Sequence, residues 1–296
     1  MKPAPFEYAA PASLDAALAL KAEHGDEAKF LAGGQSLIPA MNFRLVQAGL
    51  LVDLNRVPGL AARAVVDGEL RLGAMARQRA LERDPLVARH APLLAEALPH
   101  VAHPQIRNRG TLGGSLAHAD PAAELPVIAV ALDARLRARS LSGERWIPAS
   151  EFFLGLLTTA LTPDELLVEV ALPPLPPRTG TSFHEFARRS GDYALLGVAA
   201  VVTLDPAEVC TAARLVYLNA GDGPLSATAA AGLLVGQTLT AEALTAAADH
   251  AATREMEPLG NVHATPEYQR HLARVLSRRA LAAARDRARA RQESAV

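Results

Sequence analysis

Two pairs of adjacent glycines stand where the chain could approach a negatively charged ligand. One lies in AGGQS, residues 32–36, and the other in TLGGS, residues 111–115. Glycine allows close backbone approach, and the neighbouring Gln, Ser and Thr side chains add hydrogen-bond donors. A helix that begins directly after such a turn also presents free N–H groups and its positive dipole end. This chemistry suits a phosphate or pyrophosphate.

Each glycine pair taken alone is also typical of a plain strand-to-helix turn. Two such turns in one chain favour the functional interpretation, because a dinucleotide pyrophosphate needs donors on both sides. Neither segment fits the G-x-G-x-x-G pattern of a Rossmann site, and the sequence contains no G-K-[ST] P-loop and no G-x-S-x-G nucleophile elbow. The turns therefore predict two walls of one anion site of another kind.

Two further side chains each allow two interpretations. Glu124 is expected in the first turn of a helix, where the helix dipole favours a carboxylate whatever its role. Tyr193 follows Asp192 in a glycine-containing turn ahead of a strand. It is either a surface residue of that turn or an aromatic lid over a planar ring. The residue types alone do not choose between these roles.

The sequence gives little support to metal or thiol chemistry. His100, His103 and His118 lie near one another among the nine histidines, and their spacing matches neither a zincin helix nor a zinc knuckle. We expect loop hydrogen bonds from them and no metal site. Cys210 is the single cysteine, so the chain can form no internal disulfide and can hold no iron–sulfur cluster. Its apolar, β-branched surroundings predict a buried structural thiol.

The composition indicates a protein with a sizeable core and no nucleic-acid partner. Half of the 296 residues are apolar and the formal net charge is −1, so nothing points to nucleic acid or to an acidic membrane surface. The first residues lack the apolar stretch of a signal peptide, and the longest apolar stretch, 195–204, is too short to cross a bilayer. The expectation is a cytoplasmic protein.

Short helices and strands must position the two glycine turns. Ser13 is the expected N-cap of a helix that stops at Gly25, and Ser36 that of a helix that stops at Gly49. Asp120 is expected to cap a helix that runs to residue 134. The other expected elements are a strand entering the first turn over 28–34, a strand at 50–57, a hairpin over 62–75, helix with a proline break over 77–102, strands at 133–140, 143–153, 166–172, 196–205 and 212–221, and a C-terminal helix over 265–294.

Proline marks the best candidate for a domain boundary. The segment LPPLPPRTG, residues 172–180, is the densest proline cluster in the chain. Glycine-rich turns that alternate with helices and strands on both sides of it predict a mixed α/β or α+β chain.

Five segments occur in an order that resembles a known family. They are FLAGGQSLIPAMNFRL, VDLNRVPGL, RNRGTLGGSLAHADPAAELP, RRSGDYALLGVAAVV and YQRHLARVLSRRAL. Together they are similar to the FAD-binding medium subunit of the molybdenum hydroxylases, a group that includes the flavoproteins of carbon monoxide, aldehyde, nicotine and xanthine dehydrogenases. The similarity runs over nearly the whole chain.

This resemblance implies an α+β fold in two domains. Residues 1–176 would form a two-subdomain FAD-binding fold of the vanillyl-alcohol oxidase and p-cresol methylhydroxylase type. Residues 177–296 would form a smaller C-terminal domain with an antiparallel sheet and helices.

The resemblance also implies which residues bind FAD, without a covalent link. The two glycine turns would wrap the pyrophosphate, Glu124 would bond the ribityl chain, Val168 would contact the adenine or ring edge, and Tyr193 would stack on the isoalloxazine. The turn residues are Leu31, Ala32, Gly33, Gly34, Gln35, Ser36, Leu37 and Ile38, and Thr111, Leu112, Gly113, Gly114 and Ser115. Ser115 stands where many relatives have Asn, and Glu124 is one carbon longer than the Asp of some relatives.

The implied role is the electron exit of a larger complex. Substrate would be oxidised at a molybdopterin cofactor in a large subunit, and electrons would pass through [2Fe–2S] clusters of a small subunit to FAD and then to a quinone or NAD. No general acid, base or nucleophile is expected in this chain. The assembly would be a dimer of heterotrimers, a heterohexamer, in the cytoplasm or held at the inner face of the membrane through the complex. The substrate stays open among CO, an aldehyde and an N-heterocycle, with carbon monoxide dehydrogenase-like as the nearest label.

Two other interpretations stay open. A free-standing flavin oxidase of the vanillyl-alcohol oxidase type would need a substrate cap, for which the chain is short. A flavin-free scaffold subunit would only dock partners, and the intact glycine turns argue against it.

Overall fold

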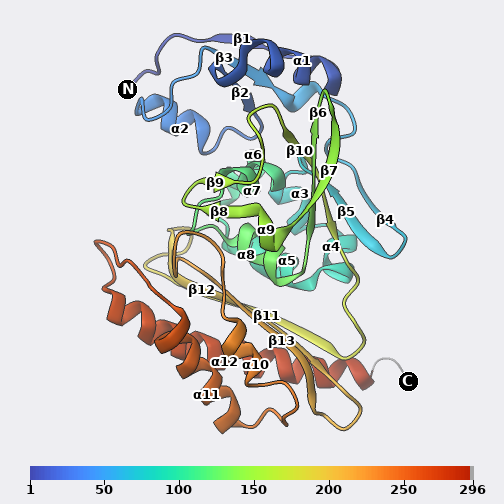
Figure 1. Cartoon of the computed structure of the whole chain (residues 1–296), viewed down its shortest axis with the longest axis vertical. Coiled ribbons are helices and arrows are strands. Elements are labelled where there is room, and N and C mark those ends of the chain that lie inside the picture. Colours follow the sequence, from blue (N-terminus) through green and yellow to red (C-terminus); the bar gives the residue numbers. More distant parts are fainter. Residues whose placement is uncertain (294–296) are drawn as a thin grey trace.

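The computed structural model describes residues 1–293, which form three successive parts along the chain (Figure 1). The first part is a three-stranded parallel sheet in the order β1-β3-β2. Its elements are β1 (Glu7–Ala9), α1 (Leu14–His24), β2 (Ala28–Leu31), α2 (Leu37–Asn42) and β3 (Leu50–Asp53). Because the strands are parallel, β2 and β3 end at the same edge of the sheet, and β2 runs directly into the first glycine turn.

The helices of this part begin where the sequence predicts, but α2 is shorter than expected. Ser13 caps α1 by accepting a hydrogen bond from a backbone N–H of its first turn at 3.2 Å. Helix α2 begins after Ser36 and ends at Asn42, so the predicted stop at Gly49 is wrong. Arg44 has a left-handed backbone with φ +59°, which cannot continue an α-helix.

The second part is built on a five-stranded antiparallel sheet in the order β4-β5-β10-β6-β7. The strands are β4 (Arg63–Val66), β5 (Glu69–Gly73), β6 (Arg135–Ser140), β7 (Gly143–Pro148) and β10 (Leu166–Leu172). The helices and the small hairpin are α3 (Gln78–Glu82), α4 (Pro85–His90), α5 (Pro92–Ala97), α6 (Pro104–Arg109), α7 (Leu112–His118), α8 (Glu124–Ala131), α9 (Ala149–Phe152), β8 (Phe153–Gly155) and β9 (Thr158–Thr159). Leu72, Leu136 and Val170 bury one face of the sheet in a core shared with these helices.

The segment between α7 and α8 is a polar turn where the sequence predicted the start of a helix. Asp120 does not cap α8, because its carboxylate accepts a hydrogen bond from the N–H of Ala122 at 2.9 Å within the turn. Helix α8 begins only at Glu124. The left-handed backbone of Ala119, with φ +51°, ends α7 just before. The turn carries Glu124 to the first position of α8.

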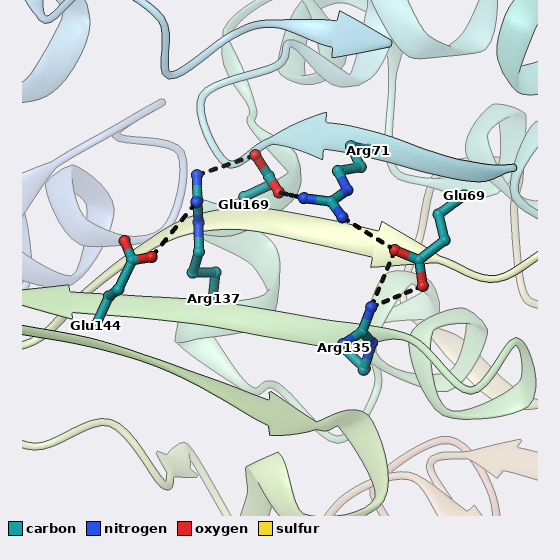
Figure 2. A network of polar contacts seen from close by, with 6 residues as sticks. All are labelled: Glu69, Arg71, Arg135, Arg137, Glu144 and Glu169. Carbon is teal, nitrogen blue, oxygen red and sulfur yellow. Dashed lines mark hydrogen bonds and ion pairs between the residues drawn. The ribbon is translucent and has the colours of Figure 1, made fainter. Parts of the chain in front are cut away.

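The other face of the five-stranded sheet carries alternating Arg and Glu side chains (Figure 2). Glu169 on the central strand β10 lies 3.6 Å from Arg71 of β5 and 3.1 Å from Arg137 of β6. Glu69 of β5 lies 3.3 Å from Arg71 of the same strand and 2.7 Å from Arg135 of β6. Opposite charges on neighbouring strands stabilise the pairing of those strands.

The third part is a four-stranded antiparallel sheet in the order β11-β12-β13-β14, covered by long helices (Figure 1). Its elements are β11 (Thr179–Ala187), β12 (Ala194–Leu204), β13 (Cys210–Leu218), β14 (Leu225–Ser226), α10 (Thr228–Gly232), α11 (Ala241–His250) and α12 (Pro266–Glu293). Single turns of other helix types lie at Gly25–Glu27, Leu54–Arg56, Leu98–His100 and Ala251–Glu255. The expected end of the last helix at Ser294 lies outside the described residues.

Strands β12 and β13 match the sequence prediction, but β11 was missed. Its sequence, TGTSFHEFA, has few aliphatic residues, although Thr181 and Ser182 are almost fully buried. Helix α12 satisfies the free edge of this strand: Arg287 donates to the carbonyl of Thr181 at 2.6 Å and Arg291 to that of Thr179 at 2.8 Å. These bonds fix β11 beside the helix.

The third sheet is covered on both faces. Ala199 and Val201 of β12 pack in the core of the second part, whereas Val198 and Val202 pack against α11 and α12. Cys210 is 1% exposed, and burial raises the pKa of its thiol to about 11, so the predicted buried structural thiol is confirmed. No helix within residues 1–293 is long and apolar enough to cross a membrane.

Candidate functional site

A cleft of about 710 Å³ is lined by segments that are far apart in the sequence. Its volume lies in the range of small-molecule and cofactor sites. The lining includes the following residues that the sequence singled out: Ala32, Gly33, Gly34, Gln35, Ser36, Leu37, Thr111, Gly113, Gly114, Ser115, Glu124 and Tyr193. The structure therefore brings both glycine turns, Glu124 and Tyr193 to one place.

The two glycine turns lie directly against each other. Gly33 is packed so closely on the carbonyl of Arg109 that a Cβ at position 33 would overlap this oxygen. A Cβ at Gly114 would lie 3.6 Å from the Cβ of Ala32. Only glycine permits the first of these approaches, because any larger residue would push the two turns apart.

The first turn offers backbone donors to the cleft. Within residues 1–293, the N–H groups of Gly34, Gln35, Ser36 and Leu37 have no protein acceptor. Gly34 adopts φ +72°, which turns the chain from β2 into α2. A series of adjacent, unpaired N–H groups at the edge of a cleft is a binding site for an anion.

The second turn differs from the first because its N–H groups are already used. Leu112 and Gly113 donate to the carbonyls of Ala76 and Ala74 at 3.0 and 2.8 Å. Gly114 donates to the hydroxyl of Thr111 at 3.0 Å, and Ser115 to the carbonyl of Thr111 at 3.2 Å. We expected backbone donors from both turns, but this wall offers close glycine backbone and the Thr111 and Ser115 hydroxyls instead.

Four of the residues implied by the resemblance do not line the cleft. Leu31 and Ile38 pack beneath the first turn, each 3.2 Å from a Cβ placed at Gly34. Leu112 is 3% exposed in the core of the second part, and Val168 is 4% exposed in the core of the first sheet. They support the walls from behind, and direct contact with a ligand remains a prediction for them.

Glu124 is a buried acid at the cleft. It is 8% exposed at the start of α8. Burial, helped by the neighbouring Glu185 carboxylate, raises the pKa of Glu124 to about 8, and the backbone N–H of α8 offsets only part of this shift. His100 lies 3.2 Å from Glu185 and so pairs with that carboxylate. At neutral pH Glu124 is therefore protonated and can donate a hydrogen bond.

Tyr193 stands at the rim of the cleft. It is 72% exposed, at the end of the loop that joins β11 to β12. The backbone of Gly191 in the same loop packs against the ring of His103, which holds the loop on the second part. An exposed ring on an anchored loop is suited to cover a planar ligand.

Several lining residues had no signal in the sequence. They come from the β8–β9 hairpin and the residues just after it, from β10, from the segment before α6 and from α6 itself: Leu157, Leu161, Leu166, Leu167, Val101, Ala102 and Ile106. Apolar residues of this kind are ordinary core formers in a sequence, so their place in the cleft depends on the fold. Among residues 1–293, no group of His, Cys, Asp or Glu is arranged to hold a metal ion.

Comparison with known proteins identifies this cleft. Residues 4–175 match the family described as the FAD-binding domain in molybdopterin dehydrogenase, and residues 181–284 match the C-terminal domain of the CO dehydrogenase flavoprotein. The chain belongs to this flavoprotein family. The resemblance inferred from the sequence is confirmed, and FAD is the cofactor of the chain.

Relatives and solved structures agree over the full length. The chain is 46% identical, over 99% of both sequences, to the alpha subunit of the 6-hydroxypseudooxynicotine dehydrogenase complex of Paenarthrobacter nicotinovorans. It is 37% identical to the carbon monoxide dehydrogenase medium chain of Hydrogenophaga pseudoflava, covering 96% of this chain and 98% of the relative. The structure of carbon monoxide dehydrogenase from that organism has a TM-score of 0.94 at 38% identity and covers 97% of this chain and 99% of its own.

These findings settle the fold and the general role. The fold is α+β, an FAD-binding domain followed by a C-terminal domain, and it is consistent with the vanillyl-alcohol oxidase type. The chain is an FAD-binding oxidoreductase subunit of a molybdenum hydroxylase, with an electron-transfer role. The cleft fits FAD, because its unpaired N–H groups suit a diphosphate and its apolar lining suits a flavin ring.

Proposed function

We propose that this chain takes electrons from a [2Fe–2S] small subunit, in a complex with a molybdopterin large subunit, and passes them to a quinone or NAD. The observation that carries the proposal is the alignment over 99% of both sequences with one subunit of a dehydrogenase complex. The chain thus matches that subunit over nearly its whole length. Its single cysteine cannot hold an iron–sulfur cluster, so the clusters belong to another chain.

The first wall of the cleft would hold the diphosphate of FAD. Bound FAD supplies the redox chemistry, and the chain binds and orients it. The free N–H groups of Gly34, Gln35 and Ser36 would donate to the diphosphate oxygens. From the second wall, the hydroxyls of Thr111 and Ser115 would add two further donors.

Glu124 and Tyr193 would orient the remainder of the cofactor. A protonated Glu124 can donate a hydrogen bond to a ribityl hydroxyl, which an ionised carboxylate cannot do. Tyr193 would cover one face of the flavin ring and limit access of water to it. Neither residue transfers a proton to substrate, since substrate would be oxidised on the large subunit.

The proposed substrate class of the complex is a nitrogen heterocycle. A subunit of nicotine 6-hydroxylase is 38% identical to this chain and one of caffeine dehydrogenase 36% identical. The structure of quinoline 2-oxidoreductase from Pseudomonas putida 86 has a TM-score of 0.92 at 38% identity. Carbon monoxide dehydrogenase chains are about as similar, so the large subunit must decide between these substrates.

The proposed assembly is a dimer of heterotrimers, and isolation of the native complex tests it. The complex purified through a tag on this chain should contain FAD, iron and molybdenum, and native mass spectrometry should give twice the mass of one heterotrimer.

The same complex tests the substrate class and the electron acceptor. A nitrogen heterocycle, but not CO, should reduce the flavin and bleach its absorbance, and a quinone or NAD should reoxidise the flavin and restore the absorbance. A homogeneous species without iron or molybdenum, oxidising its own substrate, would instead indicate a free-standing flavin oxidase.

A further inference from the structure

A chain of polar contacts lies behind the place where the two glycine turns meet. Asn55, in the turn that follows β3, donates from its side-chain amide to the carbonyl of Ala32 at 3.1 Å. Arg77, just before α3, donates to the carbonyl of Arg109 and to the side-chain oxygen of Asn55. One turn is thus held through Asn55, the other through Arg77, and these two side chains bond to each other.

Asn55 is itself fixed by its neighbours. The carboxylate of Asp53 accepts hydrogen bonds from the backbone N–H of Asn55 at 2.8 Å and from its side-chain amide. The hydroxyl of Tyr8 donates to the other oxygen of Asp53 at 2.5 Å. Burial alone would raise the pKa of Asp53, but these hydrogen bonds hold it below its ordinary value, so the carboxylate is ionised at neutral pH.

The hydrogen bond from Arg77 ends at the point where the two walls touch. The carbonyl of Arg109 that accepts the hydrogen bond from Arg77 is also the group on which Gly33 rests. Asn55 and Arg77 do not line the cleft in the described part of the chain. Their effect on a ligand must therefore pass through the backbone that they hold.

We propose that Asn55 and Arg77 are positioning residues that hold the two glycine turns at the separation required by one diphosphate. This proposal rests on the assignment of the turns as the diphosphate site of FAD. It predicts that affinity depends on side chains that never touch the cofactor. Removing either one breaks the only side-chain bridge that the described residues show between the carbonyls of Ala32 and Arg109.

The test compares Arg77→Lys, Arg77→Gln and Asn55→Ala with the unchanged chain. The dissociation constant for FAD is measured on the flavin-stripped protein from the quenching of flavin fluorescence. Lysine keeps the charge, but its single ammonium group lacks the fork that reaches two acceptors at once. We expect each of the three variants to bind FAD about tenfold more weakly, with little change between low and high salt.

Arg56→Gln is the matched control. Arg56 is exposed in the same turn as Asn55, and its side chain makes no hydrogen bond within residues 1–293. This change removes one positive charge near the site without touching either turn. Its dissociation constant for FAD should stay within about twofold of the original.

A double-mutant cycle distinguishes a bridge that Asn55 and Arg77 form together from two side chains that act independently on FAD binding. Since loss of either residue already breaks the bridge, Asn55→Ala combined with Arg77→Lys should weaken binding hardly more than one change alone. Additive losses, recovery of affinity by Arg77→Lys, or unchanged affinity in folded variants would each overturn the proposal. Circular dichroism of the flavin-free variants shows that they are folded.

One further variant separates failure of this proposal from failure of the site assignment. Ser115 lines the second wall directly, so Ser115→Ala should weaken FAD binding whether or not the bridge matters. If Ser115→Ala weakens binding but the Asn55 and Arg77 variants do not, only the positioning role is wrong. If neither kind of variant changes the affinity, the diphosphate does not lie between these turns, and both proposals fail.

Discussion

At the scale of single residues, the geometry of the site depends on the lack of a side chain at Gly33 and Gly114. Gly33 has no side chain, and this allows the first turn to rest on the carbonyl of Arg109. Gly114 lies beside the hydroxyl of Thr111, which would be 2.7 Å from an added Cβ. Both glycines bring backbone close to where a diphosphate would lie. The adjacent glycines noted in the sequence therefore have a steric reason.

Gly33→Ala should weaken FAD binding without unfolding the chain. The added methyl would overlap the carbonyl of Arg109 and push the two turns apart, so we expect a loss of about tenfold or more in affinity. The flavin retained after gel filtration and the dissociation constant for FAD measure this effect. Gly232→Ala is the control, because nothing lies within 4 Å of its added Cβ. Stoichiometric FAD in Gly33→Ala, bound as tightly as before, would contradict the assignment.

Glu124 should make stability fall as the pH rises. Its pKa is about 8 in the native state, above roughly 4.3 for an unfolded glutamate. Between these pH values the native state keeps a proton that the unfolded state has released, so the free energy of unfolding decreases with rising pH. The side chain of Glu124→Gln cannot ionise, so this variant should lack this part of the pH dependence. Its free energy of unfolding relative to the unchanged chain should therefore be higher at pH 8 than at pH 5, by up to about a few kcal/mol.

Urea unfolding of the flavin-free chain at several pH values measures this difference. Glu151→Gln serves as the control for the loss of one carboxylate, since Glu151 is exposed and does not line the cleft. Curves for Glu124→Gln that run parallel to those of the unchanged chain between pH 5 and pH 8 would show that Glu124 is ionised in the folded protein.

At the scale of elements, the strands were easier to predict than the ends of helices. Strands with dense aliphatic sequence, such as β10 and β12, lie where expected, because burial on both faces leaves few other interpretations. Helix α2 ended early and α8 began late for local reasons, the left-handed Arg44 and the turn at Asp120. Strand β11 was missed because contacts with α12, distant in the sequence, stabilise it.

The Arg and Glu face of the five-stranded sheet should contribute to stability and not to FAD binding. Glu169 lies between Arg71 and Arg137 (Figure 2). The guanidinium groups of these two arginines lie 5.7 and 5.6 Å from the centre of the Trp146 ring. Glu169→Gln would leave the like charges of Arg71 and Arg137, on the two strands that flank β10, with no carboxylate between them. We expect the free energy of unfolding to drop by about 1–2 kcal/mol, measured by urea titration.

Glu144→Gln is the comparison for this prediction. Its carboxylate is 3.8 Å from Arg137 with a half-exposed side chain, so its removal should cost less than about 0.5 kcal/mol. Both variants should retain the affinity for FAD of the unchanged chain. Equal stability of the two variants would mean that the central position of Glu169 between two arginines has no energetic consequence.

At the scale of the whole molecule, the sequence revealed the family but not the shape of the site. The five diagnostic segments are spread along the chain, so their order could be read directly. The contact between Gly33 and Arg109, and the bridge through Asn55 and Arg77, join segments far apart in sequence. Only the parallel sheet, the antiparallel sheet and the short helices between them place these segments together (Figure 1). For the same reason, the sequence could not predict that the backbone N–H groups of the first turn are free and that those of the second turn are already hydrogen-bonded.

The most direct test of the account is the absorption spectrum of the purified chain, recorded before and after acid precipitation. The account predicts flavin bands corresponding to one FAD per chain, with all of the flavin released into the supernatant by acid. Flavin that stays with the precipitated protein would contradict non-covalent binding and favour the oxidase interpretation. A colourless chain that takes up no flavin when FAD is added would contradict the cofactor site itself.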